Sequence, residues 1–155
     1  MSASTRSFRA FVEADLPALI DLWVAAWRET GFAVDFDARR EWLGNHLRAL
    51  RGQGAAIVVG LDAEGEPAGF VTIDAKSGAL DQLCVAPAER GSGLARALLD
   101  EAKRRSPGAV ELEVNEANVR ALRFYEREGF AAVSRDTSAL SGLPTLKMRW
   151  KATPP

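Results

Sequence analysis

Residues 90–96 form a glycine-rich turn of a kind that binds anions. The segment reads RGSGLAR, and its two glycines, Gly91 and Gly93, let the backbone turn tightly because they carry no Cβ. Successive backbone N–H groups can then point into one concavity at the positive end of the helix that follows. Arg90 and Arg96 flank the glycines and add positive side chains to these donors. The chemistry predicted for this turn is the binding of a phosphate or a pyrophosphate.

Two common nucleotide-binding motifs do not fit this turn. A P-loop carries a lysine that contacts the phosphates, and residues 86–96 contain no lysine. The dinucleotide-binding motif GxGxxG/A has its first glycine at the end of the strand and a small residue in its last position. Here Arg96 holds that last position, and residues 86–90 separate the strand from the first glycine. The turn is therefore expected to serve a different phosphate-bearing ligand.

The turn resembles the pyrophosphate loop [QR]-x-x-G-x-[GA] of the GNAT N-acetyltransferases, over residues 90–95. The preceding Leu83-x-Val85-x-Pro87 is similar to what that family places before its loop. A second segment, residues 110–130, resembles the second half of the same family's core, N-x-x-A-x-x-[FL]-Y-x-x-x-G-[FY]. Two motifs in the family's order are much harder to obtain by chance than either one. The matching residues of the second segment are Asn118, Ala121, Phe124, Tyr125, Gly129 and Phe130.

This resemblance implies acetyl-CoA as co-substrate. The pyrophosphate would bind the loop, and the two amides of pantetheine would pair with the edge of the preceding strand as an extra strand does. The thioester would lie where that strand parts from the strand at residues 110–114, and the backbone N–H of Val85 or Leu83 would polarise its carbonyl. The cofactor-binding residues implied are Leu83, Cys84, Val85, Arg90, Gly91, Ser92, Gly93, Leu94, Ala95, Arg96, Asn118 and Tyr125.

Transfer of an acetyl group from a thioester to an amine requires two proton transfers. The amine is protonated at neutral pH and must lose a proton, and a general acid helps the thiolate to leave. Tyr125 matches the acid tyrosine of the family. The base stays open: Glu113 lies on a strand before that tyrosine, and Asp81 lies at the start of the strand that would hold pantetheine. A water relay or Glu29 could also take the proton of the amine.

The segment that joins the first two expected helices is rich in aromatic residues and has two interpretations. Its side chains either pack on the sheet as core or lid, or they line the acceptor pocket, as the resemblance implies. An aromatic wall with one acid would favour a small-molecule amine that carries an apolar or aromatic group. A protein N-terminus or lysine as acceptor stays open, and so does a non-catalytic CoA-binding module. The residues expected to line the pocket are Trp27, Glu29, Phe32 and Phe36.

The pattern of elements predicts one domain over residues 1–155, with an α/β fold and a mixed, mostly antiparallel sheet of about seven strands. The expected order is strand, two helices, three antiparallel strands, helix, strand, helix and two strands. The strand near Thr145 is expected at an edge, where it could pair with a second copy in a homodimer. Asp15 is expected to cap the first helix. The remaining bounds are an opening strand over residues 6–12, helices over 15–31 and 37–52, and final strands over 130–134 and 145–151.

Composition narrows the classes of protein that the chain can belong to. A formal net charge of −1 argues against a general nucleic-acid binder. The chain has one cysteine, Cys84, and one histidine, His46, so we expect neither an intrachain disulfide nor a metal site built from cysteines or histidines. No stretch is apolar enough for a secretion signal or a membrane span. We therefore expect a soluble cytoplasmic protein with no metal.

Overall fold

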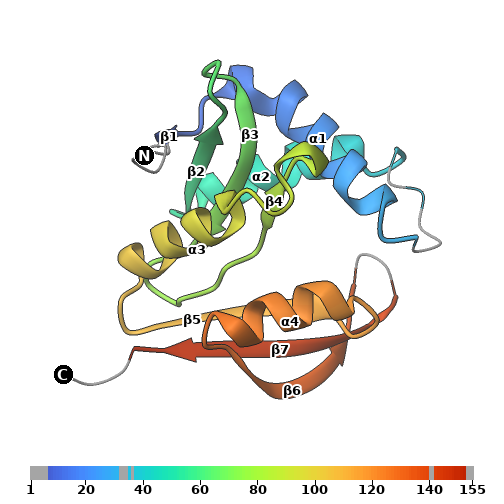
Figure 1. The fold of residues 1–155 in the computed structure, drawn as a ribbon, viewed down its shortest axis with the longest axis vertical. Coiled ribbons are helices and arrows are strands. Elements are labelled where there is room, and N and C mark those ends of the chain that lie inside the picture. Colours follow the sequence, from blue (N-terminus) through green and yellow to red (C-terminus); the bar gives the residue numbers. More distant parts are fainter. Residues whose placement is uncertain (1–6, 32–34, 36, 140–141, 153–155) are drawn as a thin grey trace.

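The computed structural model describes residues 7–31, 35, 37–139 and 142–152. Within them, seven strands and four α-helices follow one another in the predicted order (Figure 1). Short 3₁₀ helices precede α1 and α3. The elements are β1 (Ser7–Ala10), α1 (Leu16–Arg28), α2 (Arg40–Gly52), β2 (Ala56–Leu61), β3 (Pro67–Ile73), β4 (Leu83–Val85), α3 (Leu94–Arg105), β5 (Ala109–Asn115), α4 (Val119–Arg127), β6 (Ala131–Thr137) and β7 (Pro144–Lys151).

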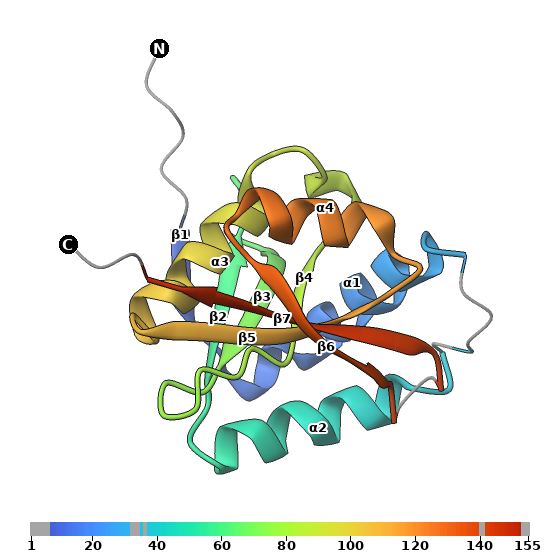
Figure 2. The same cartoon turned by 90° about the horizontal axis from the view of Figure 1, so that it is seen from below.

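The first four strands form an antiparallel sheet in the order β1-β2-β3-β4. Its central strands are almost wholly apolar, because helices cover both of their faces. Ile57 and Val59 pack with α1 and α2, whereas Val58, on the opposite face, packs with α3. Figure 2 shows α3 and α4 on one side of the sheets and α2 on the other. None of the helices in the described ranges has the length and apolar character needed to cross a bilayer.

The last three strands form a second antiparallel sheet in the order β5-β7-β6. The prediction that the strand near Thr145 lies at an edge was wrong, because the chain after β6 turns back and inserts β7 between β5 and β6. The outer strands are β5 and β6, and β6 is exposed along its whole length. Pairing with a second copy through that exposed edge would involve β6 and not β7.

The two sheets join at one point and then separate. The Leu80 amide donates to the Glu111 carbonyl, and the Glu111 amide donates to the Gly78 carbonyl, both over 2.8 Å. An isolated parallel bridge forms there between β5 and the segment that leads into β4. Beyond it β4 pairs only with β3, and β5 pairs only with β7. The result is a gap between β4 and β5, which diverge beyond the bridge.

Lys103 fixes α4 relative to α3. Its ammonium group donates to the Glu128 carbonyl at the end of α4 over 2.8 Å and lies 4.9 Å from the centre of the Trp150 ring. Gly129 follows with a φ of 94°, and a Cβ there would approach the Trp150 ring to 3.1 Å. Only glycine fits this position, so the end of α4 is held closely against β7.

Asp15 fixes the corner between β1 and α1. Its carboxylate accepts two hydrogen bonds of 2.7 Å from Arg9 and one of 2.9 Å from the Val12 amide. Asp15 precedes α1, as predicted. Its side chain, however, accepts hydrogen bonds from the residues before it and makes no capping hydrogen bond to the helix. The hydrogen bonds from Arg9, together with that from Val12, lower the pKa of Asp15, although burial opposes them.

Candidate active site

The edge of β4 that faces the gap carries backbone groups that β3 does not use. At one end the Gln82 carbonyl accepts a hydrogen bond from β3 over 2.9 Å, and at the other the Ala86 amide donates to β3 over 2.8 Å. Partners alternate along an antiparallel strand, so the backbone groups of Leu83 and Val85 point away from β3. A ligand arm that carries amides can pair with this edge.

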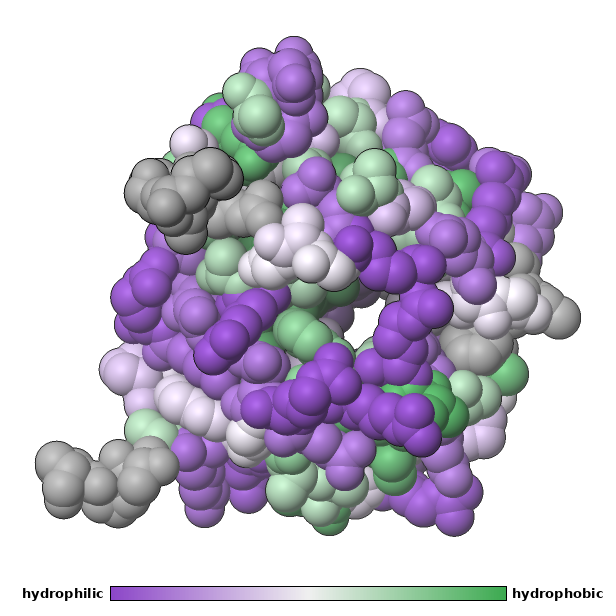
Figure 3. Space-filling model, viewed as in Figure 1, coloured by the Kyte–Doolittle hydropathy of each residue, from purple (hydrophilic) through white to green (hydrophobic). Residues whose placement is uncertain are grey.

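Two cavities lie on opposite sides of the gap. The first, of about 620 Å³, is enclosed by β4, the turn before α3, the start of α3, α4 and the end of α1. The second, of about 560 Å³, is enclosed by α1, α2, the start of β4, β5, the end of the β6–β7 connection and α4. The space-filling view shows the molecule hollowed between β4 and α4, with an opening that passes through it (Figure 3). The residues that line both cavities are Trp27, Leu83, Asn118, Ala121 and Tyr125.

The glycine-rich turn is shaped as an anion site at the wall of the first cavity. Gly91 and Gly93 have φ angles of 79° and 89°, in the left-handed region that favours glycine. Their amides and that of Ala95 make no hydrogen bond within the described part of the chain. A Cβ on either glycine would meet no atom within 4 Å, so both face open space. The Ser92 hydroxyl instead accepts from the Leu94 amide over 3.2 Å, and the Leu94 side chain is fully buried.

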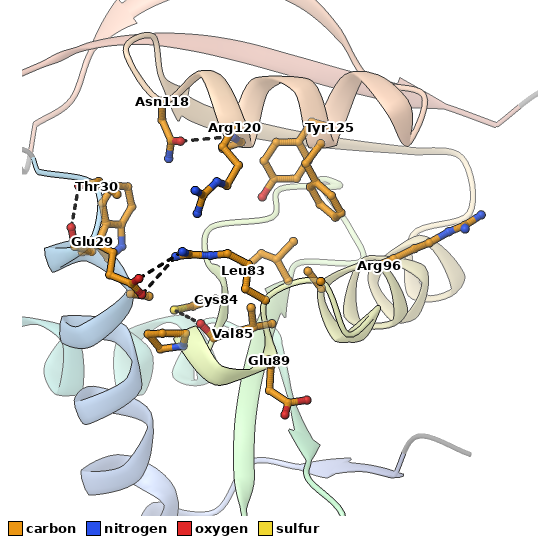
Figure 4. A pocket seen from close by; sticks show the side chains of 18 of the residues that line it. Glu29, Thr30, Leu83, Cys84, Val85, Glu89, Arg96, Asn118, Arg120 and Tyr125 are labelled. Carbon is orange, nitrogen blue, oxygen red and sulfur yellow. Dashed lines mark hydrogen bonds and ion pairs between the residues drawn. The ribbon is translucent and has the colours of Figure 1, made fainter. Parts of the chain in front are cut away.

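The first cavity carries several arginines. Arg90 forms two hydrogen bonds of 3.2 Å with Glu29, which places that glutamate on this side of the gap (Figure 4). Arg96 is mostly exposed and pairs with Glu128 at 3.4 Å. Arg120 extends from the first turn of α4 into the same cavity (Figure 4). The sequence analysis did not identify Arg120; its position just after the helix-capping Asn118 was the available signal.

Tyr125 stands where the two cavities meet. Its ring is held between Phe124 and Phe130, with centroid separations of 5.1 and 5.5 Å, and extends from α4 toward Leu83 (Figure 4). Only 9% of the residue is exposed. Burial raises the pKa of its hydroxyl, and the neighbouring Cys84 adds to the rise. The phenol therefore keeps its proton at neutral pH and can act as a proton donor.

Asn118 and Cys84, two further residues predicted to bind the cofactor, have different surroundings. Asn118 caps α4 by accepting a hydrogen bond of 3.2 Å from the Ala121 amide, and it lines both cavities. Cys84 is buried in β4, where burial raises the pKa of its thiol to about 12. That thiol is therefore uncharged at neutral pH and packs as a small apolar group.

The second cavity brings together both carboxylates named as candidate bases on strands. The Glu113 side chain is exposed on β5 and accepts a hydrogen bond of 3.4 Å from Thr145. Asp81 lies 2.6 Å from His46, which was named from the sequence only as the single histidine of the chain.

Three tryptophans, from α1 and α2, form the apolar wall of the second cavity. Trp23 is buried, and its centroid lies 6.3 Å from that of Trp42. Trp27, which was expected to line the acceptor pocket, lines both cavities. Two further residues that were expected there, Phe32 and Phe36, lie outside the described residues.

Comparison with known proteins gives a consistent family. Residues 30–152 match the model of an acetyltransferase (GNAT) domain. The chain is 29% identical to the peptidyl-lysine N-acetyltransferase YjaB of Salmonella typhimurium over 119 residues, which are 72% of this chain and 77% of that protein. It is 33% identical to a streptothricin acetyltransferase of Streptomyces lavendulae over 92 residues, 54% of this chain and 49% of that one.

Solved structures share the fold. The solution structure of apo YjaB from Escherichia coli has a TM-score of 0.78 at 24% identity, covering 97% of this chain and all of that one. The PaiA N-acetyltransferase of Thermoplasma acidophilum, solved with coenzyme A, has a TM-score of 0.74 at 19% identity over 96% of this chain and 99% of that one. The chain therefore belongs to the GNAT family and is an acetyl-CoA-dependent acetyltransferase.

Proposed function

We propose that the protein transfers the acetyl group of acetyl-CoA to the primary amine of a small molecule, with the cofactor in the first cavity and the amine in the second. The observation that carries the proposal is that the two cavities open on opposite sides of one gap and share Tyr125 and Leu83. Two substrates that enter from opposite sides can meet there without competing for one entrance.

The first cavity has the groups that coenzyme A requires. The unpaired amides of the glycine-rich turn and the arginines beside it suit a pyrophosphate, because N–H donors and positive charge converge on one place. The free edge of β4 suits the two amides of pantetheine. The thioester would then lie beside Leu83 and Val85, and an amide of one of them would stabilise the oxyanion.

Tyr125 is proposed as the general acid. The amine nitrogen attacks the thioester carbon, the carbon–sulfur bond breaks, and the sulfur takes the phenolic proton as it leaves. The pKa of Tyr125, raised by burial, keeps this proton in place at neutral pH. The nitrogen loses a proton to solvent as the amide forms, and the phenolate regains one from solvent, so the acid is restored after each turnover.

The second cavity suits an amine that carries an apolar or aromatic group. Its tryptophan wall offers faces for such a group and for the ammonium, and its carboxylates favour a cation over an anion. Asp81 and Glu113 lie on this side of the gap, whereas Glu29 faces the first cavity with Arg90. A proton acceptor for the amine is accordingly proposed on the acceptor side.

A lysine side chain in a protein is the second candidate acceptor. The observation in its favour is that the Salmonella relative, matched over 77% of its length, is named a peptidyl-lysine N-acetyltransferase. A lysine side chain also ends in a primary amine, so the same groups would serve both acceptors. The two candidates differ in whether the acceptor fits wholly inside the second cavity.

A thiol-release assay with acetyl-CoA tests the proposal. The panel holds small aliphatic and aromatic amines, lysine-containing peptides and a protein with exposed lysines, and the control is Glu64→Gln, on the exposed β2–β3 turn. We expect aromatic or apolar amines to give the highest kcat/KM, and the control variant to match the wild type. Turnover of peptides alone would favour the second candidate, and turnover of no amine would contradict both.

A further inference from the structure

His46 and Asp81 form a pair on the wall of the second cavity. The His46 Nε2 atom lies 2.6 Å from the Asp81 Oδ1 atom, although the two residues are 35 positions apart in the chain. The imidazole also stacks on Trp42, with a centroid separation of 4.4 Å and an interplanar angle of 14°. The Gln82 side chain donates to the same Asp81 oxygen over 3.1 Å, and its amide oxygen accepts from Trp23 over 3.2 Å. The ring is therefore held on one face and at one nitrogen.

This arrangement decides which nitrogen of the ring is basic. An ionised carboxylate accepts hydrogen bonds and donates none, so the Nε2 atom of His46 carries a hydrogen that it donates to Asp81. In the neutral ring the Nδ1 atom then holds the free lone pair. Both side chains keep contact with the cavity, with 25% of the His46 and 36% of the Asp81 side chain exposed.

We propose that His46 accepts the proton of the acceptor amine, directly or through one water, and that Asp81 acts as its positioning residue. The proposal rests on the proposed function above. In this step an ammonium N–H bond breaks, Nδ1 of His46 takes the proton, and the neutral amine attacks the thioester carbon. The carbon–sulfur bond breaks and the thiol leaves with the proton of Tyr125. The nitrogen loses its second proton as the amide forms, the Tyr125 phenolate takes up a proton through solvent, and the imidazolium releases its proton to solvent. Asp81 stabilises that imidazolium through the hydrogen bond on Nε2.

The other titratable groups that face this cavity are less suited to the task. Glu111 is paired with Arg149 across the sheet. Glu113 accepts from Thr145 and lies directly opposite Lys147 in the β5–β7 register, so a positive side chain offsets its charge. A carboxylate also takes up protons at lower pH than an imidazole does, which makes it the weaker base near neutral pH. The positions of α2 one turn before and one turn after His46 hold the uncharged Trp42, Leu43, Ala49 and Leu50. Arg48, two residues on, pairs with Glu13.

The test compares His46→Gln, Asp81→Asn, Glu113→Gln and the control Arg48→Gln with the wild type. Glutamine at position 46 can still donate a hydrogen bond to Asp81 but has no basic nitrogen. Arg48 lies on the same helix but pairs with Glu13 and does not line the second cavity. Each variant is measured for coenzyme A binding by calorimetry and for kcat/KM across the pH range, with the best amine of the panel. His46→Ala is also assayed with added imidazole.

We expect His46→Gln to lower kcat by about 10²-fold and to remove the loss of rate at acid pH that protonation of the imidazole causes in the wild type. Asp81→Asn should lower kcat less and shift that acid limb, and imidazole should restore part of the rate of His46→Ala. Coenzyme A binding should not change in any of them. Arg48→Gln should behave as the wild type.

Three results would overturn the inference. One is that His46→Gln keeps the rate and pH profile of a wild type that acetylates an amine. Another is that His46→Gln loses the same fraction of its rate at every pH and that imidazole does not rescue His46→Ala, since this marks a structural role only. The third is an acid limb that disappears in Glu113→Gln and persists in His46→Gln. If the wild type acetylates no amine at all, the proposed function itself fails, and the inference fails with it.

Discussion

The guanidinium group of Arg90, in the turn before α3, holds the carboxylate of Glu29, at the end of α1, through two hydrogen bonds of 3.2 Å. Both side chains are about two-fifths exposed, so water weakens the pair. The contact joins the predicted phosphate-binding turn to the helix that carries Trp27, which lines both cavities. A phosphate that binds Arg90 has to compete with Glu29 for it.

Removal of the carboxylate should therefore tighten coenzyme A binding. We expect Glu29→Gln to lower the Kd for coenzyme A by about 2- to 5-fold, because the free energy of one exposed ion pair corresponds to a change of about that size. Arg90→Gln should raise the Kd by about 10-fold and make it less dependent on salt. Calorimetric titrations at two salt concentrations measure both. Weaker binding in Glu29→Gln would mean that the pair supports the cofactor site rather than competing with it.

Gly93 can be tested by adding one methyl group. With a φ of 89°, alanine at this position costs about 1–2 kcal/mol of backbone strain, and its Cβ would project into the open anion site. The control is Gly54→Ala, since Gly54 has a φ of 99° and equally open surroundings but lies after α2, away from the turn. Both variants should lose similar stability to urea, and only Gly93→Ala should bind coenzyme A more weakly. Equal binding in the two variants would contradict the anion site.

Tyr125→Phe should lower kcat by about 10²-fold and leave the Kd for coenzyme A unchanged, because it removes one hydroxyl and keeps the buried ring. Burial raises the pKa of the Tyr125 hydroxyl, so the hydroxyl loses its proton only at a higher pH than an exposed tyrosine does. The proton is thus retained as the pH rises through the usual range of tyrosine, near about 10, and loss of this acid does not limit the wild type below that range. Steady-state kinetics over pH measure this. A wild-type kcat in the variant would remove Tyr125 from the mechanism.

Asp15 should control stability at acid pH. Because the fold lowers the pKa of this carboxyl, its contribution is present above the ordinary aspartate pKa of about 3.9 and is lost as the pH falls through the folded-state value. Asp15→Asn should reduce the free energy of unfolding by about 1–3 kcal/mol at neutral pH, and the difference should shrink as the pH is lowered.

The control for that prediction is Asp21→Asn, which breaks the exposed pair between Asp21 and Arg40. A surface pair of this kind contributes less than about 1 kcal/mol, so the control should be near the wild type. Urea unfolding of all three proteins over a pH series gives the comparison. A constant difference between Asp15→Asn and the wild type at every pH would show that charge at Asp15 is not the cause.

The sequence predicted what depends on local patterns. The order of the elements is confirmed, because the period of apolar residues and the turn residues determine helices and strands locally. The tight turn predicted at Gly91 and Gly93 is present, and both have the positive φ that glycine tolerates. The strand near Thr145 was misplaced because strand order in a sheet depends on long-range pairing, which the alternation of side chains in one strand does not encode.

Contacts between distant segments explain the rest of what the sequence did not reveal. The pair of Glu29 and Arg90 joins residues 61 positions apart, so nothing near Glu29 in the chain indicated the cavity that it faces. His46 gains its partner only when α2 packs beside the segment that leads into β4. The roles given to the site residues stay predictions, and the variants above test them.

Coenzyme A is proposed to lie in the first cavity with its sulfur at the gap beside Tyr125. A crystal structure of the complex with coenzyme A measures this directly. We expect the pyrophosphate on the amides of residues 91–95, pantetheine along Leu83 and Val85, and the sulfur within about 4 Å of the Tyr125 hydroxyl. A cofactor bound elsewhere, or a sulfur that points away from the gap, would contradict it.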